Sequence, residues 1–378
     1  MEEFKSGFVS IIGRTNVGKS TLLNTLVKEK VAIMTSKPQT TRTAIKAIVN
    51  KPNSQIIFID TPGIHKPKNK FGNVLVETAF GTISEVDVVL FVIEANSLQP
   101  GRGDKLILEK IKEKKLKTIL VINKIDMIPK QNLLQIIENY TKLYHFEAVV
   151  PVSASKQKGI EELLLEIEKQ LPKGPKYYAE EEYTDQTARQ MVAETIREKA
   201  LKLLNDEVPH GIYIEIEKMI LKKTMQKETI YHIDATIYCI KNSHKGIIIG
   251  KNGSMLKKIG TYARQDLENI LQTKVNLQLW VKVSQDWQDN EKTIQKFKMT
   301  DKKWIKNNFL QKIKLKVFTF NFNEEVGLMI KKMAWNTFKN TGNINTFLEL
   351  VEVENIEKNL KGMDNGNSKN ERNYHCWK

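Results

Sequence analysis

With 378 residues, the chain is expected to form two or three domains rather than one. Its hydrophobic content of 40% and charged content of 28% are ordinary for a globular protein. The formal net charge of +16 predicts a polyanionic partner, either nucleic acid or an anionic membrane surface, although a merely soluble basic surface is the alternative. The two cysteines lie far apart and outside any CxxC spacing, which argues against a disulfide scaffold or a zinc site and favours a reducing compartment.

The first residues, "MEEFKSGFVSIIG", pass directly from acidic residues into an apolar strand pattern, which predicts no signal peptide. The longest apolar runs, such as "VVLFVI", are far shorter than the roughly 20 residues of a membrane-spanning helix. We therefore expect a cytoplasmic monomer. The charge favours, as a secondary location, peripheral association with the cytoplasmic face of the cell membrane (the inner membrane).

Residues 1–172 alternate short apolar runs with amphipathic segments. The runs "FVSIIG", "QIIFID", "VVLFVI", "TILVIN" and "AVVPVSA" are rich in Val and Ile, as buried parallel strands are. Between and after them lie helical patterns such as "DKLILEKIKEKKLK" and "IEELLLEIEKQL". This alternation predicts an α/β domain with a mostly parallel sheet.

A second domain is predicted after a linker. Residues 173–185 carry prolines, a glycine and an acidic run, which are typical of a connection. Residues 186–298 then read as helix, two strands, a glycine-containing loop, the helix "SMLKKIGTYARQDLENIL" and the strand "KVNLQLWVKV", an α+β domain. Residues 299–378 form an extension of uncertain structure with no clear period.

The segment "GRTNVGKS" satisfies the phosphate-binding pattern GxxxxGK[ST] between a strand and a helix. Its glycines let backbone N–H groups approach phosphate oxygens at a helix N-terminus. Lys19 is expected to neutralise the β and γ phosphates, and the Ser20 hydroxyl to ligate Mg²⁺. Alone, such a match can be fortuitous.

Three further segments follow in the right order. In "DTPG", Asp60 can hold Mg²⁺ through water, and the Gly63 amide can meet the γ-phosphate. In "NKID", Asp126 can accept two hydrogen bonds from guanine, and in "SAS" the Ala154 amide can meet the base oxygen. Each segment lies at the carboxyl end of a predicted strand, where such sheets bind ligands, so the sequence predicts a GTP-binding P-loop domain. The residues expected to bind the nucleotide are Gly13, Arg14, Thr15, Asn16, Val17, Gly18, Lys19, Ser20, Thr21, Asp60, Thr61, Pro62, Gly63, Ile64, Asn123, Lys124, Ile125, Asp126, Ser153, Ala154 and Ser155.

Together with "KPQTTR", "DTPGIHKPK", "REKALKLLNDEVPHGIYIEIE" and "GIIIGKNGSMLKKIG", these segments make residues 1–298 resemble the Era family of GTPases. The resemblance implies a G domain followed by a KH-type RNA-binding domain. It also implies GTP and GDP as ligands, and the 3′ region of 16S ribosomal RNA and the 30S ribosomal subunit as partners. Thr15 departs from the family, which usually has proline there, so we expect a slightly different nucleotide affinity.

The second glycine loop, Gly250–Gly253, does not fit the phosphate-binding pattern, because Lys245 and Asn252 stand where glycine and Ser or Thr are required. Between two helical segments it reads as a GXXG loop, which clamps four nucleotides of single-stranded RNA; an exposed turn is the alternative. From residue 241 to 282, eight Lys or Arg face only two acidic residues, a balance suited to RNA. The expected RNA-binding residues are Lys245, Gly246, Ile247, Ile249, Gly250, Lys251, Asn252, Gly253, Lys257 and Lys258.

The position that carries a water-orienting glutamine in Ras-type enzymes is Ile64 here, so hydrolysis is expected to be slow or to use another group. In related GTPases an asparagine at the position of Asn16 helps to bind K⁺, which could supply transition-state charge. Thr41 is expected to ligate Mg²⁺ as the switch threonine, with Thr40 as the alternative, and His65 to be a surface residue rather than a base. The metal ligands are then Ser20, Thr41 and, through water, Asp60. The expected catalytic residues are Lys19, Asn16, Thr41 and Gly63.

Two functions remain open at this point. The first is a GTP-hydrolysing switch in small-subunit biogenesis, and the second a passive RNA-binding chaperone that binds GTP with negligible turnover. From Met333 the extension resembles the small YqzL-like proteins, either as an added module or as read-through into a neighbouring short reading frame.

Overall fold

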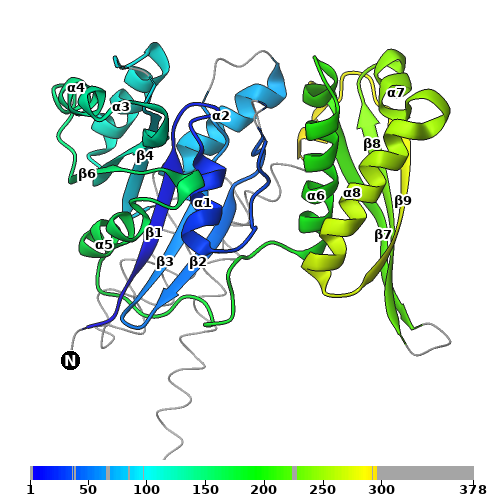
Figure 1. Cartoon of the computed structure of the whole chain (residues 1–378), viewed down its shortest axis with the longest axis horizontal. Helices are drawn as coiled ribbons and strands as arrows, with labels where there is room; N and C mark the ends of the chain where they lie inside the picture. Colours follow the sequence, from blue (N-terminus) through cyan, green and yellow to red (C-terminus); the bar gives the residue numbers. More distant parts are fainter. Residues whose placement is uncertain are drawn as a thin grey trace, which may run out of the picture. The chain divides into compact units, whose positions relative to one another are not determined.

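The computed structural model describes residues 3–35, 37, 40–64, 69–83, 86–96, 98–223, 228–291 and 293–295. All of these fall in one unit of the chain, Met1–Lys306. His65 and the extension with its YqzL-like segment lie outside the described residues. Within the described residues the strands form two sheets, one of six strands and one of three (Figure 1).

The six-stranded sheet has the order β2-β3-β1-β4-β5-β6. Its strands are β1 (Lys5–Ile12), β2 (Ile45–Lys51), β3 (Ser54–Asp60), β4 (Val88–Glu94), β5 (Thr118–Asn123) and β6 (Ala148–Pro151). Edge strand β2 runs antiparallel to β3, and the other neighbours pair in parallel. Every residue of β3 and β5 is buried, as expected for strands covered on both faces. The predicted mostly parallel sheet is confirmed.

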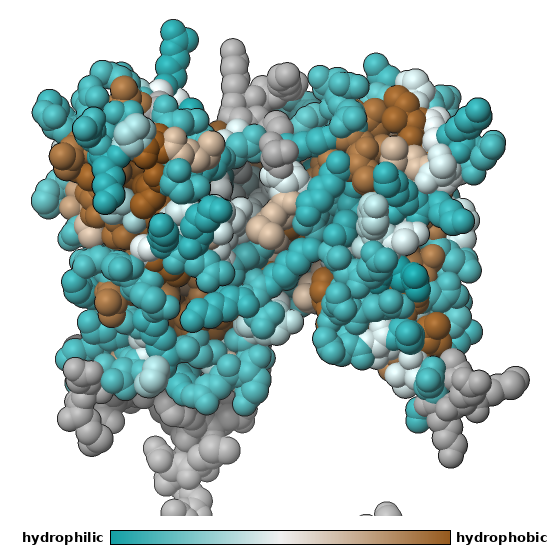
Figure 2. Space-filling view, in the orientation of Figure 1, coloured by the Kyte–Doolittle hydropathy of each residue, from teal (hydrophilic) through white to brown (hydrophobic). Residues whose placement is uncertain are grey.

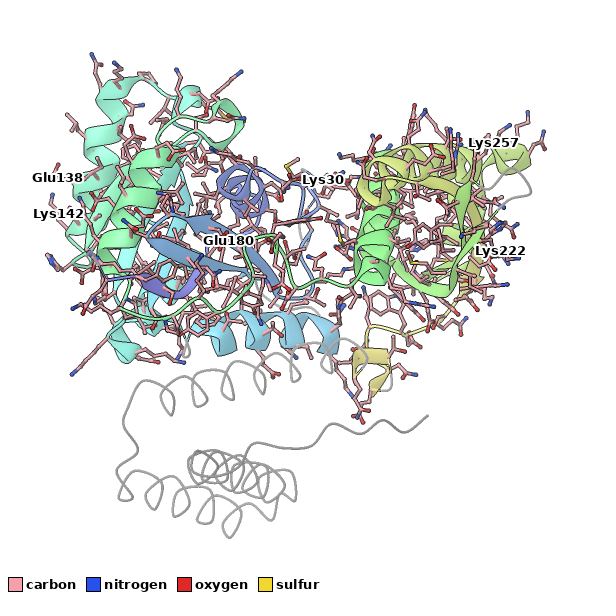
Figure 3. The ribbon with its side chains drawn as sticks, turned by 90° about the horizontal axis from the view of Figure 1, so that it is seen from below. Lys30, Glu138, Lys142, Glu180, Lys222 and Lys257 are labelled. Atoms are coloured by element: carbon pink, nitrogen blue, oxygen red, sulfur yellow. The ribbon has the colours of Figure 1, made fainter. Side chains whose placement is uncertain are left out.

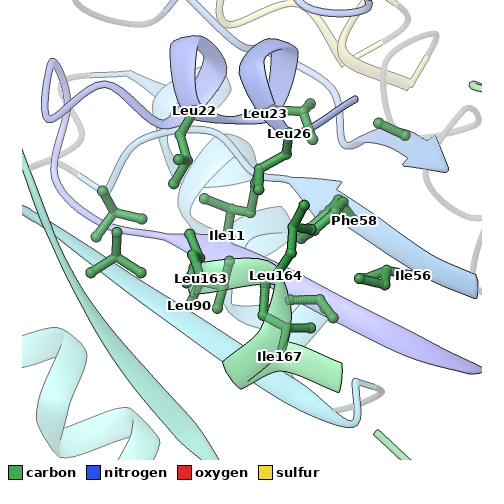
Figure 4. Close-up of a cluster of buried hydrophobic side chains, with 14 of the residues drawn as sticks. Ile11, Leu22, Leu23, Leu26, Ile56, Phe58, Leu90, Leu163, Leu164 and Ile167 are labelled. Carbon is green, nitrogen blue, oxygen red and sulfur yellow. The ribbon is translucent and has the colours of Figure 1, made fainter. Parts of the chain in front are cut away.

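Helices cover both faces of this sheet. They are α1 (Lys19–Val27), α2 (Lys70–Ile83), α3 (Arg102–Lys114), α4 (Lys130–Thr141) and α5 (Ile160–Gln170). Leucines of α1 and α5 interdigitate with Ile11, Phe58 and Leu90 of the sheet (Figure 4). Side chains of α3 and α4 pack with Phe8 and Phe91 in a second cluster. Each fully buried leucine contributes about 1.5–3 kcal/mol to the free energy of unfolding. The packed helices therefore hold in place the strand ends that carry the motifs.

The segment predicted as a linker lies against the sheet. The backbone N–H groups of Tyr177 and Tyr178 donate to Oε1 of Gln55 at 2.7 and 3.0 Å. Farther along, the carbonyl of Tyr183 accepts from the N–H of Ile48 at 3.0 Å. The connection between the two folded parts is therefore hydrogen-bonded along β2 and β3.

The three-stranded sheet has the order β7-β8-β9, with β7 and β8 antiparallel and β8 and β9 parallel. Its strands are β7 (Tyr213–Lys223), β8 (Thr229–Cys239) and β9 (Lys274–Val283), and its helices α6 (Ala188–Leu203), α7 (Asn242–Ile249) and α8 (Ser254–Leu271). A capping box between Thr187 and Gln190 begins α6. Alternate residues of β8, such as Ile233, Ala235 and Ile237, pack under the helices. The helices therefore cover one face of the sheet (Figure 1).

Short 3₁₀ turns complete the described elements: η1 (Ile125–Met127), η2 (Ala154–Lys156), η3 (Val208–Gly211) and η4 (Lys251–Gly253). Hydrophilic side chains predominate on the face drawn in Figure 2. In the described part of the chain, no helix has the length and apolar character needed to cross a membrane.

Candidate functional site

The phosphate-binding loop joins β1 to α1 and ends at a glycine with a positive φ angle. Gly18 has φ +97°, and a Cβ atom there would lie 2.3 Å from Nδ2 of Asn123, so a larger residue is excluded. Nζ of Lys19 lies 3.1 Å from the carbonyl oxygen of Gly13 and 2.8 Å from that of Arg14. Burial lowers the pKa of Lys19 to about 8, and the charge of Asp60 opposes that effect. The ammonium group is therefore held inside the loop, where phosphate oxygens would meet it.

Three oxygen-bearing side chains from separate segments converge next to this loop. Oδ2 of Asp60 accepts hydrogen bonds from Ser20 Oγ at 2.8 Å and Thr41 Oγ1 at 3.0 Å, and the two hydroxyl oxygens are 2.9 Å apart. Asp60 is fully buried, and its Oδ1 atom has no hydrogen-bond partner. Burial raises the pKa of Asp60, while the nearby Lys19 acts in the opposite direction. An unpaired buried carboxylate oxygen beside two hydroxyls fits a hard cation such as Mg²⁺.

The described residues contain no group of three or more His, Cys, Asp or Glu that could hold a metal ion. The hydroxyl-rich cluster of Ser20, Thr41 and Asp60 is therefore the candidate metal site that these residues offer. Thr40, the alternative switch threonine, bonds instead through its hydroxyl to Thr35 at 3.0 Å and to the carbonyl of Lys37 at 2.7 Å. The geometry thus favours Thr41.

The predicted base-reading segments meet behind the loop. Nδ2 of Asn123 donates to the Val17 carbonyl at 2.9 Å, and its Oδ1 accepts from the Ala154 amide at 3.1 Å. Nζ of Lys124 lies 2.9 Å from the carbonyl of Asn16. These bonds tie the ends of β5 and β6 to the phosphate loop, so the three motifs form one site.

Asp126 lies at the rim of this site with its carboxylate exposed. Its Oδ1 accepts from Ser153 Oγ at 2.5 Å. That hydrogen bond is the main reason that the pKa of Asp126 is lowered. An ionised carboxylate is the form that accepts two N–H groups from a guanine ring.

The segment after β3 supplies backbone rather than side-chain groups. The N–H of Ile64 donates to the Gly13 carbonyl at 3.3 Å, while the Ile64 side chain is buried in the core and brings no polar atom to the site. A Cβ atom on Gly63 would lie 2.8 Å from the methyl carbon of Thr15, so the residue that departs from the family pattern packs directly on this glycine.

Some expected residues contribute only their backbone or lie outside the pocket. Nε of Arg14 is 3.0 Å from Asp104 on α3, so its guanidinium is directed away from the loop. Val17 is buried, whereas Asn16 is exposed.

A cavity of about 650 Å³, within the usual size range of ligand pockets, adjoins the phosphate-binding loop. Its lining includes Met34, Thr35, Lys37, Leu201 and Lys202, which sequence reasoning did not identify.

The second glycine loop separates α7 from α8. Gly250 has φ +72°, and a Cβ atom there would lie 2.8 Å from that of Met255, so glycine is required. Lys251, Asn252, Lys257 and Lys258 are exposed beside it; Figure 3 shows Lys257 at the molecular surface. Ile248 packs in the core, whereas Ile247 is 50% exposed. Of the two isoleucines expected to bind RNA, Ile247 is therefore exposed, whereas Ile249 is partly buried against the core.

A cavity of about 390 Å³ adjoins this loop and is lined by residues of α8 and β9. It offers apolar walls and basic groups together, as a site for nucleic-acid bases and phosphates does. Sequence reasoning identified Gly253 and Lys257 here and missed the other residues, of which four lie on α8 and two on β9, beyond the loop motif itself. The remaining lining residues are Leu256, Gly260, Thr261, Arg264, Leu277 and Leu279.

Comparison with known families matches both folded parts. Residues 8–124 match the model of the 50S ribosome-binding GTPase family, and residues 207–288 match that of the KH domain. "GTPase Era" of Clostridium botulinum (strain Okra / Type B1) is 52% identical over 288 residues, which are 76% of this chain and 96% of that protein. The chain belongs to the Era family of GTPases. The same protein of Clostridium kluyveri (strain ATCC 8527) is 49% identical over 290 residues, covering 77% and 97% of the two chains.

Two solved Era structures share the architecture. One is Era in complex with MgGDPNP and nucleotides 1506–1542 of 16S ribosomal RNA, with 41% identity and a TM-score of 0.74 over 78% of this chain and 98% of that one. The other is an Aquifex aeolicus Era variant bound to GDP·AlF4⁻, with 40% identity and a TM-score of 0.73 over 78% and 99%. The Era resemblance predicted from the motifs is confirmed, as is the order of G domain and KH domain.

Proposed function

We propose that this Era-family GTPase is a switch that binds 16S ribosomal RNA near its 3′ end and acts in biogenesis of the 30S ribosomal subunit. The observation that carries the proposal is the presence, on one chain, of the Ser20–Thr41–Asp60 cluster and an exposed GXXG loop. The Era complex with MgGDPNP and an rRNA fragment supports the same pairing of ligands.

The nucleotide roles follow from the contacts. Lys19 faces the β and γ phosphates of GTP, and Asp126 selects guanine. Ser20 and Thr41 would hold Mg²⁺ directly and Asp60 would hold it through water, and the bound ion would neutralise charge on the phosphates. Thr41, whose hydroxyl bonds to Asp60 at 3.0 Å, is the proposed switch threonine of this site.

Hydrolysis requires a substitute for the missing water-orienting glutamine. The Ile64 side chain is 5% exposed and has no polar atom, so it can neither orient the attacking water nor stabilise charge in the transition state. In this proposal Asn16, which lines the phosphate pocket and has φ 65°, helps to bind K⁺ next to the phosphates. K⁺ would then supply positive charge that an arginine finger supplies in other GTPases.

The buried Ile64 also supports the second candidate, a passive RNA chaperone with negligible turnover. Multiple-turnover phosphate release, measured in K⁺ and in Na⁺ buffer, separates the two. Turnover stimulated by K⁺ supports the switch, and turnover no faster than free GTP in both buffers supports the chaperone. Crosslinking to ribosomal RNA with GTP or GDP bound then tests whether the nucleotide controls RNA binding.

The domain limits and the cellular setting are proposals as well. We assign residues 1–172 to the G domain, 173–185 to the connection and 186–298 to the KH domain, in a cytoplasmic monomer. Peripheral association with an anionic membrane rests on the net charge of +16. Flotation with anionic and neutral vesicles tests that association, and sedimentation equilibrium tests the monomer.

A further inference from the structure

Two buried arginines flank the switch threonine on either side. Thr41 lies between Thr40, whose carbonyl accepts a hydrogen bond from Arg197, and Arg42, whose guanidinium donates to the carbonyl of Ile212. Arg197 belongs to α6, which precedes the first strand of the KH domain. The backbone on both sides of Thr41 is therefore held by groups from outside the G domain.

Arg197 is oriented by its own helix. Nε and Nη2 of its guanidinium both bond to the carboxylate of Glu194, one turn earlier, so the group is clamped in a bidentate pair. Its side chain is only 2% exposed. Nη2 also donates a hydrogen bond to the Thr40 carbonyl, which belongs to the same peptide group as the Thr41 N–H.

Arg42 fixes the other side. Its guanidinium donates to the carbonyl oxygens of Ile212 at 2.5 Å and His210 at 3.2 Å, just before β7. It also lies 5.6 Å from the ring of Phe71 on α2 and 5.5 Å from that of Trp287 after β9. Burial, followed by the charge of Arg197, lowers the pKa of Arg42 to about 9.

The cost of this arrangement indicates that it is specific. Nε of Arg42 and Nη1 of Arg197 are buried without hydrogen-bond partners, so two like charges are kept close and incompletely paired. A core built for stability alone would not place two guanidinium groups there, since hydrophobic residues do as well or better. Their hydrogen bonds go to the Thr40 carbonyl and to groups of residues 186–298, and Arg42 also contacts Phe71 on α2 of the G domain.

We propose that Arg197 is a positioning residue for GTP hydrolysis: through the Thr40 carbonyl it holds Thr41 against Asp60, so that the KH domain sets the occupancy of the closed switch. The proposal rests on the proposed function, because it takes Thr41 as the switch threonine. Movement of α6 when the KH domain engages RNA would reach Thr41 through one hydrogen bond.

The test compares the full chain with Arg197→Ala, using kcat, the Mg²⁺ concentration for half-maximal activity, and GDP affinity. We expect kcat to fall and the Mg²⁺ requirement to rise by about tenfold, the effect of losing one charged hydrogen bond. GDP affinity should stay within about twofold, because GDP binding does not need the closed switch. The matched control is Arg189→Ala, which removes an exposed arginine of the same helix bonded to the Ile216 carbonyl.

A second variant, Glu194→Gln, guards against loss of folding. It loosens the clamp on Arg197 without emptying the core, so an intermediate effect on kcat is expected. Unchanged kcat and Mg²⁺ requirement in both variants overturn the proposal, as does an equal loss of GDP affinity, which would show a general structural role. A parent chain that fails to hydrolyse GTP, or does so without Mg²⁺, would instead contradict the proposed function itself.

Discussion

The Nζ atom of Lys30, just beyond α1, lies 2.7 Å from Oε2 of Glu198 on α6, whose side chain is completely buried. The same ammonium group lies 2.8 Å from Asp266 on α8. Lys202 pairs with the other Glu198 oxygen at 2.7 Å. One lysine of the G domain thus bridges two helices of the KH domain. Of the two carboxylates that it pairs with, that of Glu198 is inaccessible to water.

Lys30→Ala should lower the free energy of unfolding by about 1–3 kcal/mol, because Oε2 of the buried Glu198 carboxylate then keeps only the Lys199 ammonium, 3.9 Å away, as its cationic partner. Urea denaturation of the full chain measures the change. The control is Lys28→Ala, whose pair with Glu161 is exposed on both sides and should be worth less than about 0.5 kcal/mol. Equal losses in the two variants would contradict a special role for the buried pair.

The same cluster predicts how stability depends on pH. Burial would raise the pKa values of Glu198 and Asp266, but hydrogen bonds from lysines outweigh burial and lower both pKa values. Burial would lower the pKa of Lys30, but its hydrogen bonds to Asp266 and Glu198 outweigh burial and raise that pKa. The two carboxylates therefore stabilise the fold fully when the pH lies above their ordinary pKa values of 4.5 and 3.8. This stabilisation is lost as the pH falls through their lowered pKa values in the folded protein. Lys30 stabilises the fold fully when the pH lies below its ordinary pKa of 10.5, and this stabilisation is lost as the pH rises through its raised pKa in the folded protein. The difference between parent and Lys30→Ala should be constant from about pH 5 to 9 and shrink outside that window.

Nucleotide affinity should also depend on pH, through Lys19. Burial lowers its pKa to about 8, so the ammonium group loses its charge as the pH rises through that value. We expect the Kd for GDP to be constant at neutral pH and to rise above pH 8 by up to about tenfold per unit. Isothermal titration calorimetry over this range measures it. Lys19→Met should bind weakly at every pH; a parent Kd that stays flat to pH 10 would remove the explanation.

Base specificity should depend on Asp126. Asp126→Asn replaces a double acceptor by a group that presents a donor to guanine, so GTP affinity should fall by about 2–4 kcal/mol, the scale of a broken charged hydrogen bond with an unpaired donor. Xanthosine triphosphate, which presents an acceptor at that position, should gain relative to GTP. Competition binding with both nucleotides measures the exchange, and equal GTP affinity in variant and parent would show that another residue reads the base.

Much of the G domain could be predicted because its information is local. Short motifs at the ends of apolar strands determine where Lys19, Asp60 and Asn123 lie, and parallel strands bring those ends to one edge. The loop glycines Gly18 and Gly250 could likewise be assigned from a few neighbouring letters, since each needs a positive φ angle.

Elements with mixed patterns could not be predicted. Strand β2 was missed because it carries Lys46 inside its apolar run, and only the structure shows that this buried lysine pairs with Asp185 at 3.1 Å. Helix α2 was missed because Gly72 and Gly81 weaken its helical signal. Charged Arg197 and Glu198 in α6 read as a solvated face, and only tertiary packing identifies their buried partners.

The two glycine loops should separate by function. Lys251→Asp with Asn252→Asp places two carboxylates where RNA phosphates approach, and keeps both loop glycines, so the backbone is not strained. Asn252 already has φ 52°, a conformation that aspartate tolerates. Binding to single-stranded RNA of the 16S 3′ region should fall more than about a hundredfold at moderate salt, because repulsion replaces attraction at the closest backbone contact. GTP affinity should stay within about twofold.

The chain offers a control with the same change of residue types and charge. Lys274→Asp with Asn276→Asp alters two exposed residues of β9, which alternate with Val275 and Leu277 and therefore lie on the sheet face opposite the helices. This control should weaken RNA binding only through net charge, and its loss should largely vanish when salt is raised. The loop variant should remain defective at the same salt, since the clamp itself is blocked. If both variants lose RNA binding equally at every salt concentration, the GXXG loop is not the contact and the net charge of the domain accounts for RNA affinity.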